Sequence, residues 1–237
     1  MKKTFAILLA AAALTGCFNI RIKDDGILKI TDDAIMLGSF KKIKSEGPEV
    51  GKTYPVEAFS AITANGGFDI TVTPGDSVKV EVNAAENIHD VLEIKADGGV
   101  LVIGTKDKVE IDKAEIAIQV PSLTALKVNG ASDLEIKGNV AGEEFKLEIN
   151  GAADVSAEKI ACKEASVKIN GAGDVNFEEI DVTDLKVSIN GAGDVVVTGK
   201  AVNVEAKVNG VGEIDATGLE ISGEFKKKIS GIGSVKR

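Results

Sequence analysis

The residues with the greatest chemical potential are two cysteines, Cys17 and Cys162, and one histidine, His89. A nucleophilic Cys–His site would need the two side chains to meet, yet His89 lies far from Cys162 in an unrelated sequence context. We therefore expect Cys162 to act as a small, buried apolar residue. A single histidine also excludes a multi-histidine metal site, and we expect no metal and no cofactor.

The first 17 residues point to covalent chemistry at Cys17. Lys2 and Lys3 precede a short apolar run, 6–14, which is below the ~20 residues that span a bilayer and is typical of a signal peptide. The run leads into Leu14-Thr15-Gly16-Cys17, which resembles the lipobox of bacterial lipoproteins, whose cysteine becomes the acylated N-terminus. The resemblance implies that residues 1–16 are a signal peptide and that lipid on Cys17 holds the protein on a membrane.

Phe18 follows Cys17, at the position where many lipoproteins retained at the inner membrane carry aspartate. The resemblance therefore implies attachment to the outer membrane. It leaves open whether the protein faces the periplasm or the cell surface.

Five carboxylates recur at a regular interval in the second half of the chain, each four residues after an asparagine: Asp133, Asp154, Asp174, Asp194 and Glu213. Calcium prefers oxygen ligands, but it takes about six to eight of them, and each repeat supplies only one carboxylate. Like charges at the spacing of neighbouring strands repel by somewhat under ~1 kcal/mol in water. We therefore expect an acidic column whose side chains are solvated or accept hydrogen bonds from backbone amides.

Asn-Gly or Ser-Gly pairs mark the repeat to which these carboxylates belong. The pairs follow one another at steps of 21, 20, 20, 19 and 21 residues, and a period of this size indicates stacked supersecondary units. Positions five, three and one before the asparagine, and five and seven after it, are apolar, which is the period of a strand with one buried face. Asn-Gly between two strands suits a backbone with positive φ and so predicts a sharp corner. The corners are Asn129-Gly130, Asn150-Gly151, Asn170-Gly171, Asn190-Gly191, Asn209-Gly210 and Ser230-Gly231.

Two all-β architectures fit this repeat: a right-handed parallel β-helix with one coil per repeat, and an antiparallel β-meander of hairpins. The near-constant period favours the β-helix, because identical corners can stack on one another. Ala152, Ala172 and Ala192 are expected to point inward at the corner, which is difficult to reconcile with hairpins. The β-helix further predicts a ladder of asparagine side chains whose amides bond up and down the stack.

Asn-Gly-Ala-Gly-Asp-Val recurs every 20 residues behind a lipobox, and this combination resembles the head GIN domain of putative auto-transporter adhesins. The resemblance runs from about Phe59 to the end of the chain and includes an earlier corner at Asn65-Gly66-Gly67. It implies a β-helix, an adhesive function and no catalytic residues. The chain would then consist of a signal peptide (1–16), an irregular tether (17–57) and a β-helical head (58–237).

Composition narrows the function further. The formal net charge of -9 disfavours nucleic acid as a partner, because phosphates need a basic patch. A carbohydrate-active enzyme is disfavoured because the chain has no Trp, and Phe145, Phe177 and Phe225 fall at inward positions. We expect a non-catalytic outer-membrane lipoprotein that binds a surface ligand or polysaccharide. The alternative is a periplasmic scaffold that forms homo-oligomers through the unpaired strand edges at the ends of the β-helix.

Overall fold

The computed structural model describes residues 21–22, 28–29 and 42–237. The chain divides into two compact units, Met1–Phe40 and Lys41–Arg237. In the first unit, β1 (Arg21–Ile22) pairs antiparallel with β2 (Leu28–Lys29). Cys17 and the predicted signal peptide lie outside the described residues.

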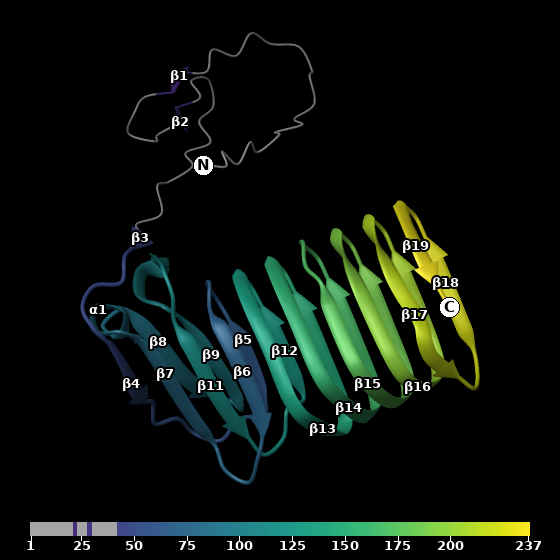
Figure 1. Cartoon of the computed structure of the whole chain (residues 1–237), viewed down its shortest axis with the longest axis horizontal. Coiled ribbons are helices and arrows are strands. Elements are labelled where there is room, and N and C mark those ends of the chain that lie inside the picture. The colour runs from purple at the N-terminus through teal and green to yellow at the C-terminus, as the bar shows by residue number, and fades with distance from the viewer. Residues whose placement is uncertain (1–20, 23–27, 30–41) are drawn as a thin grey trace. The chain divides into compact units, whose positions relative to one another are not determined.

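The second unit is built almost entirely of strands (Figure 1). Its two helical turns are α1 (Glu86–His89) and the 3-10 turn η1 (Lys106–Lys108). The strands up to residue 128 are β3 (Lys42–Ile43), β4 (Glu49–Thr53), β5 (Ala61–Ala64), β6 (Asp69–Pro74), β7 (Lys79–Ala85), β8 (Leu92–Asp97), β9 (Val100–Thr105), β10 (Glu110–Ile111), β11 (Glu115–Val120) and β12 (Ala125–Val128). The later strands are β13 (Ala131–Ile149), β14 (Ala152–Ile169), β15 (Val175–Ile189), β16 (Ala192–Val208), β17 (Val211–Ile221), β18 (Phe225–Ile229) and β19 (Ile232–Lys236).

The later strands form a parallel β-helix, in which each repeat is one coil. β13 to β17 pair in chain order and in parallel, so that Ile149 lies opposite Ile169 and Ile169 opposite Ile189. Equivalent positions of successive coils therefore stack directly, as the repeat predicts. The β-helix prediction is confirmed, and the antiparallel meander is wrong for this part of the chain.

The apolar positions of the repeat fill the interior of the coils. Phe145 and Phe177 are completely buried, and their rings meet edge to face with centroids 6.2 Å apart. The columns before the corner end on Ile149, Ile169 and Ile189, all of them fully buried. Burial of such side chains contributes about 1.5–3 kcal/mol each, which makes this core the main source of stability.

Small differences in repeat length are accommodated by irregularities within the strands, outside the Asn-Gly corners. The pairing of β13 with β14 shifts register between Ile136 and Asn139, and that of β15 with β16 shifts between Phe177 and Ile180. Gly138 and Gly199, with φ of 74° and 116°, lie at these irregularities, where a side chain would strain the backbone. The Asn-Gly corners therefore remain in register although the step varies from 19 to 21 residues.

The expected reason for the corner glycines is wrong. None of the glycines at the corners from Gly130 to Gly210 has positive φ. Instead, a Cβ atom on Gly171 would overlap the carbonyl oxygen of Gly151, and the same overlap recurs at each of these corners. Glycine is needed because the backbones of successive coils approach too closely for any side chain.

The alanines two residues after the asparagine also differ from expectation. Ala152, Ala172 and Ala192 are exposed, and the inward position is the next one, where Ala153 is 5% exposed. The period of two therefore continues through the corner, with Gly151 and Ala153 one and three residues after the asparagine in the same phase as the buried Ile149.

The first coils are stacked in an order that differs from their order in the sequence. β5 and β6 lie directly against β12 and β13, whereas β9 and β11 lie on the other side of β5 and β6, all in parallel. The intervening strands β7 and β8 pair antiparallel with β11 and β9, and β4 pairs with β7. The chain thus builds its second coil first, returns to build the first, and then continues with the third.

Gly171→Ala should destabilise the head, because the new methyl group must push two stacked coils apart. We expect the free energy of unfolding to fall by about 1–3 kcal/mol, the usual range for overpacking. Urea unfolding followed by circular dichroism measures this change.

Gly142→Ala is the matched control for that substitution. A Cβ atom at Gly142, which lies within β13 and not at a corner, would meet no atom within 4 Å. Its unfolding free energy should stay equal to that of the wild type or rise by ~0.4–1 kcal/mol through a less flexible unfolded chain. Equal effects of the two substitutions would contradict the close-stacking explanation.

Candidate functional site

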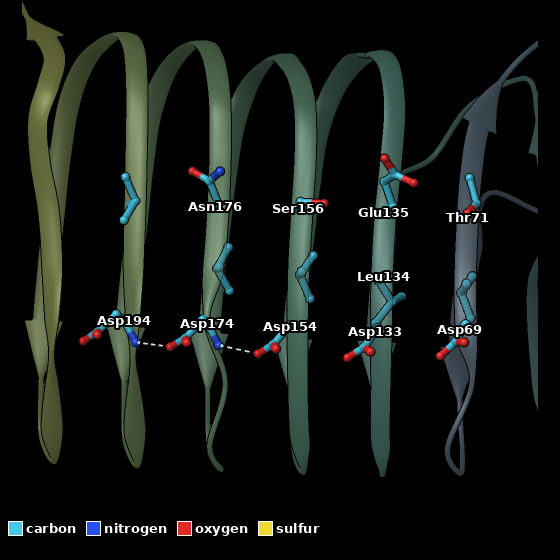
Figure 2. A pocket seen from close by; sticks show the side chains of 14 residues that line it. Asp69, Thr71, Asp133, Leu134, Glu135, Asp154, Ser156, Asp174, Asn176 and Asp194 are labelled. Carbon is cyan, nitrogen blue, oxygen red and sulfur yellow. Dashed lines mark hydrogen bonds between the residues drawn. The ribbon is translucent and has the colours of Figure 1, made fainter. Parts of the chain in front are cut away.

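A groove of about 610 Å3 runs across five successive coils on one side of the solenoid (Figure 2). Two rows of outward-facing side chains line it. The first row is the acidic column, here extended to Asp69, with Asp133, Asp154, Asp174 and Asp194. The second row, two residues further along each coil, consists of Thr71, Glu135, Ser156, Asn176 and Val196.

The alternation of the strands and their parallel register place these rows. Asp133 lies opposite Asp69 on β6 and opposite Asp154 on β14, so the carboxylates stack as a column. The residue between the rows points inward, as Leu134 and Val155 do, both nearly fully buried. Because side chains alternate along a strand, the second row is as regular as the first. A second hollow of about 510 Å3 continues from Asp69 and Thr71 toward Lys52 and Glu115.

Part of the acidic column is tied to the backbone of the neighbouring coil. Oδ1 of Asp174 accepts a hydrogen bond from the amide of Asp194 at 2.9 Å, and Oδ1 of Asp194 accepts one from the amide of Glu213 at 2.8 Å. Asp154 accepts from the amide of Asp174 over a longer 3.4 Å. Such bonds to charged acceptors offset the repulsion within the column. The carboxylates remain exposed, so their second oxygens face solvent in the groove.

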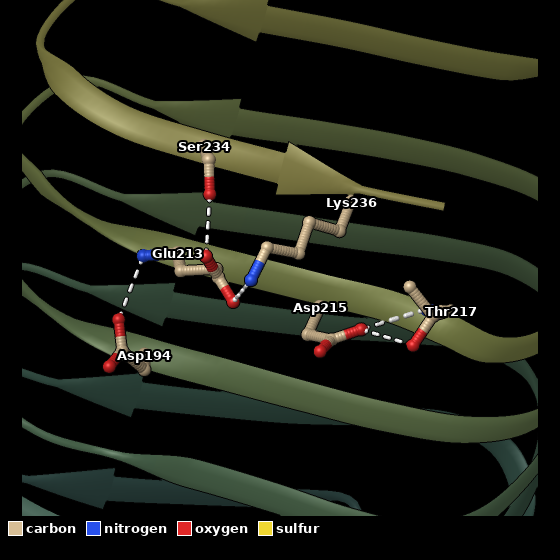
Figure 3. A network of polar contacts seen from close by, with 6 residues as sticks. All are labelled: Asp194, Glu213, Asp215, Thr217, Ser234 and Lys236. Carbon is tan, nitrogen blue, oxygen red and sulfur yellow. Dashed lines mark hydrogen bonds and ion pairs between the residues drawn. The ribbon is translucent and has the colours of Figure 1, made fainter.

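The acidic column ends in a polar network on the last coils (Figure 3). The two oxygens of Glu213 are engaged by Nζ of Lys236 at 2.6 Å and by the hydroxyl of Ser234 at 2.7 Å. These two donors, Lys236 first, hold the pKa of Glu213 below its usual range. Hydrogen bonds from the hydroxyl and amide of Thr217 likewise lower the pKa of Asp215. Both carboxylates are thus kept ionised at this end of the column.

A ladder of asparagine side chains stands four residues before the acidic column in each coil. In every step the Nδ2 group of one asparagine donates to Oδ1 of the asparagine on the preceding coil. The bonds measure 2.9 Å from Asn129 to Asn65, 3.0 Å from Asn150 to Asn129, 2.8 Å from Asn170 to Asn150, 3.0 Å from Asn190 to Asn170 and 2.9 Å from Asn209 to Asn190. All the bonds run in one direction and link six coils.

Sequence reasoning missed several residues of the site. Asn65 belongs to the ladder and Asp69 to the acidic column, although Asp69 follows Asn65 by the same four residues as in the later repeats. The shared spacing of four residues between asparagine and carboxylate was the signal in the sequence that could have identified both residues. The second row of the groove gave no signal, because its residue types vary from coil to coil.

Cys162 and His89, the two residues considered for nucleophilic chemistry, lie apart from the groove, and their hydrogen bonds serve the fold. Cys162 is buried and its thiol, whose pKa is raised by burial, donates to the carbonyl of Glu164 at 3.2 Å. His89 is 7% exposed, and its Nε2 donates to the carbonyl of Val50 at 2.9 Å. The other ring nitrogen, Nδ1, forms a hydrogen bond with the Tyr54 hydroxyl at 2.9 Å. Both side chains hold their own parts of the fold together.

The described residues, 21–22, 28–29 and 42–237, contain neither a metal-binding cluster nor a membrane-spanning helix. Among them, no group of three or more His, Cys, Asp and Glu side chains is placed to hold a metal ion. None of the helices in the described ranges is long and apolar enough to cross a membrane.

The fold and the groove define a β-solenoid with an open lateral surface. Residues 58–236 match the family described as "Putative auto-transporter adhesin, head GIN domain", and the chain belongs to this family. No protein of curated function matches the sequence.

Solved structures of similar fold bear related names. A putative adhesin from Bacteroides fragilis aligns with a TM-score of 0.65 and 19% identity over 82% of this chain and 99% of its own. Putative adhesins from Parabacteroides distasonis and Parabacteroides merdae both have a TM-score of 0.55, with 21% and 16% identity. Each alignment covers 83% of this chain, and 99% and 100% of the respective relative. At these identities the likeness concerns the fold, and none of the three names denotes an enzyme.

Replacing both Asn170 and Asn190 with alanine should remove three steps of the asparagine ladder. Each hydrogen bond contributes about 0.5–1.5 kcal/mol net, with exposed bonds at the low end. We expect the double variant to lose ~1–3 kcal/mol of unfolding free energy and to melt at a lower temperature. Asn176→Ala, which shortens an exposed asparagine of the groove, should change stability by less than ~0.5 kcal/mol. An unchanged melting temperature of the double variant would show that the ladder adds nothing to stability.

Proposed function

We propose that the protein is a non-catalytic adhesin of the outer membrane, anchored by lipid on Cys17 and binding an extended ligand along the groove. The observation that carries this proposal is the continuity of the groove, whose two rows repeat on five coils. A surface that repeats at the spacing of β-strands, about 4.8 Å, suits a polymer that repeats along its own length.

The chemistry of the groove favours a polysaccharide with neutral or cationic units. Carboxylate oxygens accept hydrogen bonds from sugar hydroxyls, and the side chains of Thr71, Ser156 and Asn176 can both donate and accept. The row of carboxylates repels an anionic polymer. Short side chains leave the floor open to a broad, flat ligand.

The arrangement of the carboxylates supports binding rather than hydrolysis. Glycosidases place an acid and a carboxylate on opposite sides of the scissile bond. Here the five aspartates form one row on one strand face, each in an equivalent position of its coil. Membership of an adhesin family agrees with this interpretation.

The other function considered is a self-associating scaffold in the periplasm. It rests on one observation: within the described residues, β18 pairs only with β16, and β19 only with β17. Each of these strands therefore has one edge without a partner strand, to which another chain could add.

Cys17→Ser tests the anchor. If Cys17 carries the lipid, the substitution should move most of the protein from the membrane fraction to the soluble fraction, measured by immunoblot after cell lysis and ultracentrifugation. Cys162→Ser, which alters the buried thiol, is the control and should leave the protein with the membranes. Retention of the Cys17→Ser variant on the membrane would refute the lipid anchor.

Asn176→Arg tests the groove, because its long cationic side chain would fill the groove at the fourth of its five coils. Cells that carry this variant should bind immobilised polysaccharides at least ~10-fold less than cells with the wild type, a loss of ~1.4 kcal/mol. Thr183→Arg, an exposed position on the same strand outside the groove residues, should leave binding unchanged.

Protease treatment of intact cells completes this test, since adhesion requires the head to be outside. Loss of the head from intact cells is expected. Protection until the outer membrane is opened would favour the periplasmic scaffold, and equal binding by the two arginine variants would exclude the groove as the binding surface.

A further inference from the structure

The interior columns of the solenoid end on two cations at the C-terminal coil. On β18, Lys227 lies opposite Ala206, in the column that Leu147, Val167 and Val187 occupy in earlier coils. All four of these apolar side chains are buried, whereas Lys227 is exposed. A charge therefore stands where the repeat requires an apolar residue.

Arg237 completes the same pattern on the neighbouring strand. The register of β19 on β17 pairs Lys236 with Asp215, so Arg237 follows opposite Ala216, which is buried. The Arg237 guanidinium carbon lies 5.1 Å from the centre of the Phe225 ring, the partly buried last member of its column. This cation–π contact places the charge over the end of the core.

Neither cation belongs to the ion pairs that the outward lysines form. Lys226 pairs with Glu224 at 2.7 Å, and Lys236 pairs with Glu213 at 2.6 Å. Among the described residues, no ion pair joins Lys227 or Arg237 to the carboxylate side chain of another residue, whereas both outward lysines have one. Residues 225–237 contain five cations and no acidic residue, in a chain whose net charge is -9.

A second copy stacked on this end would have to bury both charges in the interior columns. Burying an unpaired charge is strongly unfavourable, and here two of them would be buried together. Inward-pointing charges are a known means by which an exposed sheet edge avoids pairing with another chain. The edges of β18 and β19 are therefore unpaired, but the charges at the end of the interior columns oppose the stacking of another coil on them.

We infer that Lys227 and Arg237 close the C-terminal end of the solenoid and prevent end-to-end association with a second copy of this chain. The surface that they block is otherwise suited to self-association, since Ile229, which lies opposite the fully buried Val208, is 41% exposed there. This role is independent of ligand binding in the groove. These charges disfavour the periplasmic scaffold, because they oppose association through the strand edges on which that alternative rests.

The test compares two double variants that each remove two cations from the same coil. Lys227→Val with Arg237→Leu makes the interior columns apolar to their end. Lys226→Val with Lys228→Leu is the control, because both residues lie at outward positions opposite Glu205 and Lys207. The full chain, extracted in detergent, is analysed by sedimentation velocity over a range of protein concentrations.

We expect the wild type and the control to sediment as single chains, and the inward variant to reach about twice that mass, as a closed dimer requires, or more. Association of the wild type, or equal association of both variants, would overturn the inference. So would an inward variant that stays monomeric while circular dichroism shows it folded. If the inward variant does not fold, Lys227→Ala alone serves, with Lys228→Ala as its control.

Discussion

The close approach of backbones at the Asn-Gly corner is the constraint on which the rest of the structure depends. Because a Cβ atom at Gly151, Gly171 or Gly191 would overlap the carbonyl oxygen of the coil below, only glycine allows the coils to stack there. Once the corners stack, every position of one repeat lies above the same position of the last. Ladders of like residues follow from this register: the buried columns, the asparagine amides and the carboxylates.

The same register places repeated chemical groups in lines along the outside of the solenoid. A ladder inside the coils excludes water and provides stability, whereas a ladder outside them repeats one chemical group along a line. The carboxylates show how the repulsion in such a line is reduced, since Asp174 and Asp194 each accept a backbone amide from the next coil. The variable row beside them, with Thr71, Ser156 and Asn176, can change without disturbing the stack. If the groove binds a ligand as proposed, its specificity would reside in this row.

The sequence predicts the coils from residue 125 onward well, because each contains its own corner, alternation and period. It predicts less at the start, where Asn65 stacks on Asn129 although 64 residues separate them. Nothing local indicates that the segment between them folds back to form β9 and β11 on the opposite side of β5 and β6. The corner glycines show another limit: the residue type was recognised, but its cause was a contact with a distant coil, which propensities for φ do not reveal. The groove, likewise, requires the stack before its second row can be identified.

The two ends of the solenoid differ in the features that limit pairing of their outermost strands with another chain. At the first end, the antiparallel strands β7 and β8 pair with β11 and β9, and His89 connects α1 to the Val50 carbonyl of β4 and to Tyr54. At the last end the coil carries its own charges in the interior columns, with Arg237 over Phe225. Antiparallel strands at the first end and charges at the last end both interrupt the parallel stacking of equivalent coils. The lateral groove lies across the middle of that axis, so a ligand can bind there without competing with either end.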